Sequence, residues 1–243
     1  MQHSVPRLVR VVGHNLRQGI HQAHSEVRRL HGAHARASVI ERYMASHEVR
    51  CVQFGAGGNL LREWLNTDLE PPSPDVIYLD ITEPLPFANG SIDFLFSEHL
   101  IEHVPHAEGA SHVRECFRVL KPSGRLRVAT PDLQFLIDIY THTDHTDTQS
   151  RYVQRTIAEA FPQDGFYDGA FVLNHFVRHW GHQFIYDERT LSTALQRVGF
   201  ERVHRWPVGQ SDEPRLQNIE HHGDAISPEF NRLQTMVLEA SKS

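Results

Sequence analysis

Three glycines follow a short apolar run in the sequence Arg50-Cys51-Val52-Gln53-Phe54-Gly55-Ala56-Gly57-Gly58-Asn59. The apolar residues predict a buried strand of a parallel sheet over residues 51–54. The next residues, Leu60-Leu61-Arg62-Glu63-Trp64-Leu65, are expected to form a short helix. A strand, a glycine turn and a helix are a nucleotide-binding arrangement, because the glycines permit a tight turn and the helix start offers free N–H groups. A glycine turn alone is weak evidence, since many such turns bind nothing.

Three further segments bring a polar residue to the end of a predicted strand. Asp68 follows the next short run, Asp80 lies in the apolar run 76–81, and Ser97 ends the run 91–97. Because parallel strands end at one edge of a sheet, these side chains are expected to lie along the same edge. That edge is where open α/β sheets bind ligands.

The order and the sequences of these segments resemble those of the class I S-adenosylmethionine-dependent methyltransferases of the methyltransferase type 11 kind. Leu85-Pro86-Phe87-Ala88-Asn89-Gly90-Ser91-Ile92-Asp93 is similar to that family's LPF…SFD segment. Val119-Leu120-Lys121-Pro122-Ser123-Gly124-Arg125-Leu126 is similar to its VLKPGG turn into the fifth strand. The resemblance covers residues 50–132 well and residues 183–241 more loosely. It is fairly specific for the cofactor and hardly specific for the substrate.

The resemblance implies an α/β fold with a Rossmann-like, seven-stranded, mostly parallel sheet and helices on both faces. N-terminal helices and a helical insertion after strand five are expected in addition. The implied cofactor is S-adenosyl-L-methionine. The backbone of the glycine turn would face its amino-acid end, Asp68 its ribose, and Asp80 with Ile81 its adenine. The expected cofactor-binding residues are Phe54, Gly55, Ala56, Gly57, Asn59, Asp68, Leu69, Asp80, Ile81, Ser97, Glu98 and His99.

Some positions depart from the family pattern. Gln53 stands where the family usually has an acid, and Asn59 where it often has a small residue. Asp68 follows the glycines sooner than usual. These departures affect the expected ribose contact more than the expected class of ligand.

Length and composition describe an ordinary globular protein. The chain has 243 residues, of which 40% are hydrophobic and 22% are charged. This length is sufficient for one large domain with additional segments. The net charge of −6 argues against nucleic acid as a partner, and no run is long and apolar enough to span a bilayer. Cys51 falls in a predicted strand and Cys116 in a predicted helix, which argues against a disulfide and favours a reduced, cytoplasmic compartment.

Residues 1–48 are predicted to form a helical extension, and residues 49–243 the methyltransferase domain. Residues 1–50 carry a charge of +5, which leaves −11 for the rest of the chain. This extension is expected to pack on the domain or to form a homodimer. The alternatives are a helix that lies on a membrane surface and a segment that binds an anionic substrate. A solvated face is favoured over a metal site for its histidine stripe, which comprises His14, His21, His24, His31 and His34.

The segment Ser97-Glu98-His99-Leu100-Ile101-Glu102-His103 contains two Glu-His pairs four residues apart. On a helix, His99 and His103 would lie on one face and could bind a metal. The favoured interpretation is that this segment is the loop after strand four of a methyltransferase, because its Glu-His sequence is itself part of the resemblance. No metal-binding residue is therefore predicted, and His99 remains at the cofactor edge, where a base would be useful.

Residues 133–182 are too many for a simple crossover and form the expected substrate-side insertion. They predict a helix near residues 133–140 and concentrate aromatic side chains after residue 160. Interleaved polar groups include His175 and His182. Aromatic surface with a few convergent polar groups suits a substrate pocket, and it suits the core of a helical cap equally well. The aromatic residues are Phe161, Phe166, Tyr167, Phe171, Phe176 and Trp180.

The C-terminal part predicts one helix and two strands. Asp187 is the expected N-cap of a helix over residues 188–198, and Gly199 its terminator. Residues 200–206 and 235–240 are expected to be the last two strands, paired as an antiparallel edge hairpin. Residues 210–228 are predicted to be an irregular loop that closes over the substrate.

These observations lead to one functional hypothesis and two rivals. The hypothesis is methyl transfer without a metal to a small-molecule or carbohydrate acceptor, at a hydroxyl. Residues 57–66 (GGNLLREWLN) and residues 174–188 (NHF…WGHQFIYDE) look like predicted methyltransferases associated with polysaccharide biosynthesis. A histidine suits as base because its pKa is near neutrality, and the candidates are His99, His103, His175 and His182. The rivals are a nicotinamide-dependent Rossmann-type enzyme and a non-catalytic cofactor-binding subunit.

Overall fold

The computed structural model describes residues 36–142, 144–163 and 168–243. Its contacts divide the chain into two units, Met1–Ser46 and His47–Ser243. In the first unit, residues 36–46 form a helix. The predicted histidine stripe lies outside the described residues, as does most of the predicted basic extension. Phe166 and Tyr167 of the insertion lie outside them too.

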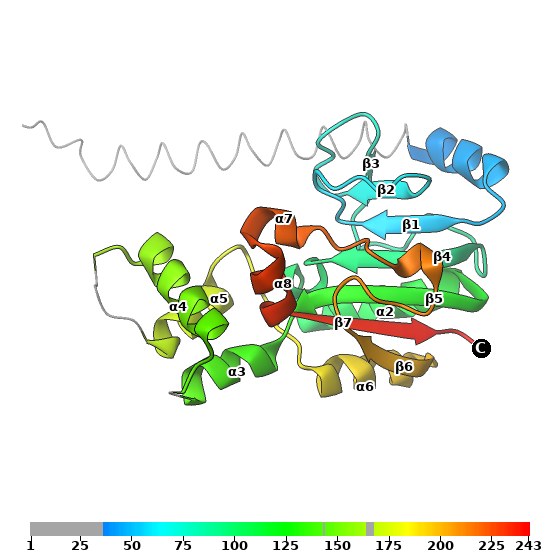
Figure 1. The fold of residues 1–243 in the computed structure, drawn as a ribbon. Helices are drawn as coiled ribbons and strands as arrows, with labels where there is room; N and C mark the ends of the chain where they lie inside the picture. Colours follow the sequence, from blue (N-terminus) through cyan, green and yellow to red (C-terminus); the bar gives the residue numbers. More distant parts are fainter. Residues whose placement is uncertain (1–35, 143, 164–167) are drawn as a thin grey trace, which may run out of the picture. The chain divides into compact units, whose positions relative to one another are not determined.

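The second unit is built on a seven-stranded sheet with the order β3-β2-β1-β4-β5-β7-β6 (Figure 1). β7 runs antiparallel to β5 and β6, and the other described pairings are parallel. This confirms the Rossmann-like fold class and the antiparallel edge hairpin. The strands are β1 (Cys51–Phe54), β2 (Leu65–Asp68), β3 (Ile77–Tyr78), β4 (Ile92–Glu98), β5 (Leu120–Pro131), β6 (Glu201–Trp206) and β7 (Thr235–Ser241).

The helix predicted for residues 60–65 is wrong, because Leu65 already begins β2 and turns precede it. A crossover that contains a helix needs about a dozen residues, and only residues 55–64 connect β1 to β2. Side-chain hydrogen bonds of Asn66 stabilise this connection, in place of the backbone hydrogen bonds that a helix would form. Asn66 Oδ1 accepts from Leu61 N at 3.0 Å, and its Nδ2 donates to the carbonyls of Leu61 and Trp64 at 3.1 Å. The short connection also explains why Asp68 follows the glycines so soon.

Helices α2 (His106–Val119) and α6 (Glu188–Val198) cover one face of the sheet, behind it in Figure 1. As predicted, the side chain of Asp187 caps α6 by accepting from Thr190 N, and Gly199 ends it in the left-handed conformation. In front of the sheet lies the segment with the short helix η2 (Pro214–Leu216). Its Leu216 and Ile219 pack against residues of β4 and β7. The sheet is thus covered on both faces.

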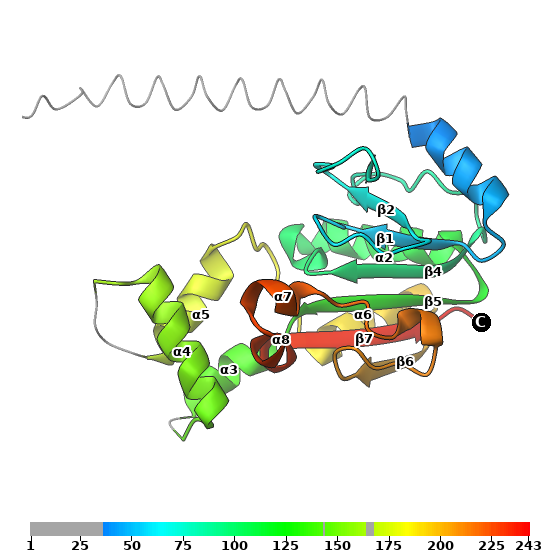
Figure 2. The same cartoon turned by 45° about the horizontal axis from the view of Figure 1, so that its top comes forward.

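The insertion forms three helices, α3 (Leu133–Thr141), α4 (Asp147–Ala160) and α5 (Gly169–Arg178), here called the cap. Figures 1 and 2 show the cap beside the carboxyl end of β5. The cap has a hydrophobic core of its own, which Phe230 of α8 (Pro228–Gln234) completes. α3 turns Leu136 and Ile139 inward, whereas its Ile137 and Tyr140 are exposed.

The predicted irregular loop over residues 210–228 contains regular structure. Besides η2, it includes α7 (His222–Ile226), which follows a glutamate-anchored turn described below. Both cysteines, Cys51 and Cys116, are free and buried, and burial raises the pKa of each thiol. Among the described residues, no helix has the length and apolar character needed to cross a membrane.

Candidate functional site

The glycine turn lies where the carboxyl ends of β1 and β2 meet the loop after β4. Gly55 and Gly57 have φ values of +65° and +51°, which side-chain-bearing residues rarely adopt. A Cβ added to Gly55 would lie 3.0 Å from Leu100, so the turn passes close to the β4 loop. Ala56 N donates to Thr67 O at 2.9 Å and ties the turn to β2. The sequence-predicted glycine residues therefore do lie at one sheet edge.

Asp68 fastens this turn. Its Oδ2 accepts from Gly57 N at 2.9 Å and its Oδ1 from Glu70 N at 2.8 Å. Asp80 plays a similar local role, since its Oδ1 accepts from the backbone and hydroxyl of Thr82. Both acids lie at strand ends as predicted, and their contacts with ribose and adenine stay predictions.

The other candidates near the turn differ in exposure. Phe54 points away from the turn, with its ring 5.0 Å from that of His112 in α2, so only its backbone reaches the edge. Leu69 is exposed and Ile81 is buried. Asn59 has a buried Nδ2 without a hydrogen-bond partner among the described residues.

At the end of β4, Ser97 is buried and Glu98 anchors a distant segment. The Glu98 carboxylate accepts from the backbone N–H groups of His221 and His222, at 2.9 and 3.0 Å. Burial raises the pKa of Glu98 above its ordinary value, against the lowering effect of these two hydrogen bonds. Glu98 therefore places the start of α7 against the end of β4.

This placement stacks His222 on His99, with ring centroids 3.9 Å apart. His99 has a φ of +48°, and its Nε2 lies 3.0 Å from Thr235 Oγ1. Its Nδ1 lies 3.3 Å from Oε1 of Glu102. Strained backbone conformations concentrate at functional sites, and here the strain directs the His99 ring toward the buried carboxylate.

Glu102 is fully buried beneath these histidines. Burial by itself would raise its pKa, but the close contact with His99, together with His103, outweighs burial and holds the pKa of Glu102 below its ordinary value. Glu102 is therefore a carboxylate, and it faces imidazole rings.

All four sequence-predicted catalytic histidines line one cavity of about 660 Å³ between the sheet edge and the cap. Its walls also include several aromatic side chains and the charged side chains of Arg155 and Glu159. Burial lowers the pKa of His175 and His182, and it lowers that of His222 to about 4, so these rings are neutral near pH 7. The name histidine cavity is used below for the space lined by His99, His103, His175, His182, His222, Tyr152, Arg155, Glu159, Phe176 and Trp180.

Sequence reasoning missed two members of this group, Glu102 and His222. Glu102 belongs to the second Glu-His pair, so the repeated pair was a usable signal. His222 carried no local signal, because only the distant Glu98 brings it to the site.

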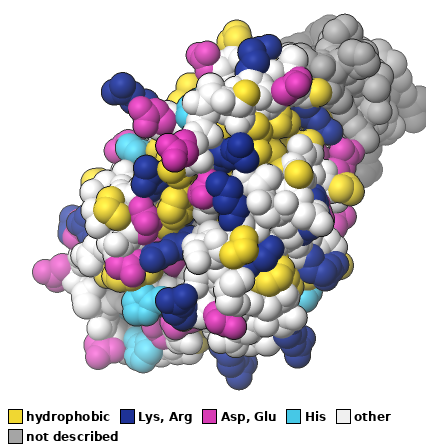
Figure 3. All heavy atoms as spheres, turned by 90° about the vertical axis from the view of Figure 1, so that its right-hand side faces the viewer, with side chains coloured by type: hydrophobic (Ala, Val, Ile, Leu, Met, Phe, Trp, Pro, Cys, Tyr) yellow, Lys and Arg dark blue, Asp and Glu magenta, His cyan; other side chains and the backbone are white. Residues whose placement is uncertain are grey.

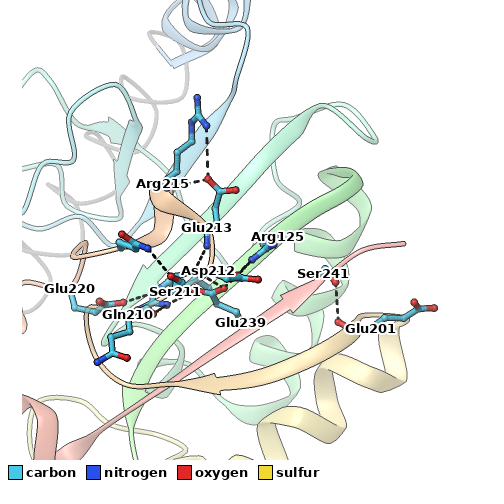
Figure 4. Close-up of polar contacts among 12 residues, drawn as sticks. Arg125, Glu201, Gln210, Ser211, Asp212, Glu213, Arg215, Glu220, Glu239 and Ser241 are labelled. Carbon is cyan, nitrogen blue, oxygen red and sulfur yellow. Dashed lines mark hydrogen bonds and ion pairs between the residues drawn. The ribbon is translucent and has the colours of Figure 1, made fainter.

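The segment that delivers His222 crosses the sheet and is anchored there by a buried ion network (Figure 4). Arg127 of β5 pairs with Glu220 and with Glu239 of β7, and all three are buried. Arg127 Nη1 also donates to Gln210 O at 2.8 Å. The network therefore fixes both ends of the segment 210–220.

A second cavity of about 490 Å³ lies near the far end of β6 and β7, and is lined by Arg125, Arg202, Asp212 and Glu239 among others. Figure 3 shows charges of both signs interspersed on the face at that end. Arg125 is paired with Asp212. Because its charges are mutually compensated, this cavity offers no clear ligand preference.

Comparisons with known proteins address the fold and the donor. Residues 44–128 match a family described as a methyltransferase domain. A methyltransferase structure from Archaeoglobus fulgidus is 17% identical, with 88% of this chain and 94% of that chain covered and a TM-score of 0.46. One from Mesorhizobium loti is 17% identical, with 80% and 91% covered and a TM-score of 0.47. A phosphoethanolamine N-methyltransferase from Haemonchus contortus, solved with S-adenosylhomocysteine, is 11% identical, with 80% and 49% covered and a TM-score of 0.42. No curated protein matches the chain.

The three structural likenesses have TM-scores below 0.5 and carry no weight in the assignment. The family match covers the glycine turn and continues into β5, the part that holds all the expected cofactor-binding residues. It also argues against the nicotinamide-dependent rival. Together with the seven-strand order, this match over residues 44–128 supports S-adenosylmethionine-dependent methyl transfer as the activity of the enzyme.

Proposed function

We propose that this enzyme transfers the methyl group of S-adenosylmethionine to a hydroxyl of a small-molecule or carbohydrate acceptor held in the histidine cavity. One observation carries the proposal. Five histidines line a cavity of about 660 Å³ at the sheet edge that also bears the glycine turn. A volume of this size suits a small ligand.

The chemistry asks for positioning and for removal of a proton. The methyl group of a sulfonium is already activated, so holding donor and acceptor in line supplies much of the rate acceleration. A hydroxyl acceptor must lose its proton, and a neutral imidazole can accept it. His175 and His222 have the lowered pKa that keeps an imidazole neutral at pH 7. In this scheme the transfer step itself needs no metal, which stays a prediction from the sequence.

The cap supports a carbohydrate acceptor. Trp180 is 58% exposed although it lies at the histidine cavity, and Phe176 adds a second ring. Aromatic faces pack against the apolar C–H faces of sugars, while charged groups such as those of Arg155 and Glu159 bind sugar hydroxyls. A role in polysaccharide biosynthesis rests on the resemblance of residues 57–66 and 174–188 and remains part of the proposal.

The test is transfer of labelled methyl groups from S-adenosylmethionine to a panel of acceptors. The panel contains sugars, nucleotide sugars and other small alcohols, with matched amino sugars and primary amines as controls. We expect label on a hydroxyl of at least one carbohydrate, located by mass spectrometry after hydrolysis. Label only on amines, or cofactor binding without transfer to any acceptor, would contradict the proposal.

A further inference from the structure

The buried carboxylate of Glu102 has one oxygen that the described protein groups leave unsatisfied. Its Oε2 accepts from Thr130 Oγ1 at 3.0 Å, whereas Oε1 lies 3.3 Å from His99 Nδ1 and forms no hydrogen bond of good geometry with any described residue. His103 Nε2 lies 3.9 Å from Oε1. An unpaired buried carboxylate oxygen is costly. Its position among imidazole nitrogens points to a positive ion.

His182 presents a free nitrogen to the same place. Its Nδ1 lies 2.7 Å from Phe176 O, and because a carbonyl can only accept, Nδ1 carries the proton. Nε2 is therefore unprotonated and has a lone pair to offer. Metal-binding histidines commonly donate their second N–H to a backbone carbonyl in this way, which fixes the tautomer and the ring.

The backbone holds these groups together across a long stretch of sequence. Trp180 and Gly181 have φ values of +55° and +79°, which turn the chain back from α5 toward the β4 loop. Gln183 N and Phe184 N then donate to Glu102 O at 2.7 and 3.2 Å. Gln183 Nε2 donates to His103 O at 3.0 Å. The turn with His182 is thus fastened to the residues that it faces.

We propose that Glu102, His103 and His182 form a binding site for one divalent ion of a first-row transition metal such as Zn²⁺. Their ligand atoms lie within 4.8 Å of one another. In a tetrahedral site with bonds of about 2.0 Å, ligand atoms lie about 3.3 Å apart, so small side-chain rotations suffice. Two imidazoles favour a transition metal over Mg²⁺ or Ca²⁺, which prefer oxygen ligands.

This site differs from the pairing that the sequence suggested. Residues 99–103 contain only the three-residue helix η1 (Ile101–His103), so His99 and His103 do not share a helix face. The third ligand, His182, comes from the turn after α5, and the proposal differs from the sequence expectation that no residue binds a metal. Three protein ligands leave a fourth position open in the histidine cavity. If the proposed function holds, an acceptor hydroxyl bound there would become more acidic.

The experiment measures metal binding alone, without cofactor or acceptor. Full-length protein stripped of metal by a chelator is titrated with Zn²⁺ by calorimetry and with Co²⁺ by visible absorption. We expect one site whose affinity falls at least tenfold in both Glu102→Gln and His182→Ala. The matched control is His179→Ala, an exposed histidine three residues from His182 that is not part of the cluster, and it should retain the affinity of the unsubstituted protein.

The variants also separate this site from the five histidines at positions 14–34, which could bind Zn²⁺ on their own. Unchanged affinity in both Glu102→Gln and His182→Ala would overturn the proposal, as would the lack of any binding by the unsubstituted protein. If Glu102→Gln does not fold by circular dichroism, His103→Ala takes its place, because that side chain is 35% exposed. Binding requires no methyl transfer, so the outcome does not depend on the acceptor proposed above.

Discussion

Gly57 and the neighbouring Gly58 permit a matched test of the turn at the scale of single residues. A Cβ on either would meet nothing within 4 Å, but only Gly57 has a positive φ, of +51°. Gly57→Ala therefore changes little except the backbone preference, at a cost of about 1 kcal/mol. We expect Gly57→Ala to weaken S-adenosylmethionine binding about fivefold or more in calorimetric titrations, and Gly58→Ala to leave it unchanged. Equal affinities of the two variants would show that the turn conformation does not matter for the cofactor.

The residue scale also contains the least predictable part of the site. The repeated Glu-His pair indicated His99 and His103 as candidates, and the sequence of the insertion indicated His175 and His182. The structure places all four around one cavity. Glu102, the neighbour of His99, His103 and His182, was not predicted, because burial depends on what packs above a residue. A charged side chain gives no local sign that it will be fully enclosed.

At the scale of the elements, α2 packs His112 against β1. Burial lowers the pKa of His112 from 6.5 to about 4, partly offset by the charge of Glu115. Between these two pH values the unfolded chain binds a proton that the folded chain does not bind, so stability falls as pH decreases from 6.5 to 4. The total effect is on the order of 3 kcal/mol. We expect His112→Gln to be less stable at pH 7 and to lose less stability on acidification, measured by urea denaturation at several pH values. The same slope in both proteins would contradict the assignment.

The segment before α7 is an element without regular structure, and its anchor can be tested in the same way. Glu220→Gln removes one of the two carboxylates that neutralise the buried Arg127. We expect a loss of about 2–3 kcal/mol in the free energy of unfolding, measured by chemical denaturation. The control is Glu229→Gln, which removes an exposed partner of Arg151 and should leave stability nearly unchanged. A similarly small effect in both variants would mean that the network does not hold the segment.

At the scale of the whole molecule, the sheet edge and the cap are expected to divide the work between donor and acceptor. Trp180 is exposed at the histidine cavity and belongs to the turn after α5, far in sequence from the glycine turn. We therefore expect Trp180→Ala to raise the KM for the acceptor about tenfold or more and to leave the dissociation constant of S-adenosylmethionine unchanged. Steady-state kinetics and calorimetry measure the two quantities. Weaker cofactor binding with an unchanged acceptor KM would reverse this division.

Much of the architecture follows from local sequence. The apolar runs at residues 51–54 and 91–97 predicted β1 and β4, and the cap residues Asp187 and Gly199 predicted both ends of α6. These features depend on periodicity and on turn residues, which act over a few positions. The helix predicted for residues 60–65 failed because the connection from β1 to β2 is too short for it, and strand pairing overrode the helix preference.

The sequence by itself determined the sheet, the edge that carries the glycine turn and the types of residue at the site. Only the tertiary structure decided which of them meet. Glu98 brings His222 onto His99, and the turn at Trp180 and Gly181 brings His182 to Glu102 and His103. The physical reason is that these contacts join residues far apart in the chain, through hydrogen bonds to backbone groups that every sequence possesses. Local sequence patterns indicate which face of a helix or strand is buried. Contacts between side chains that are distant in the sequence depend on how whole elements pack.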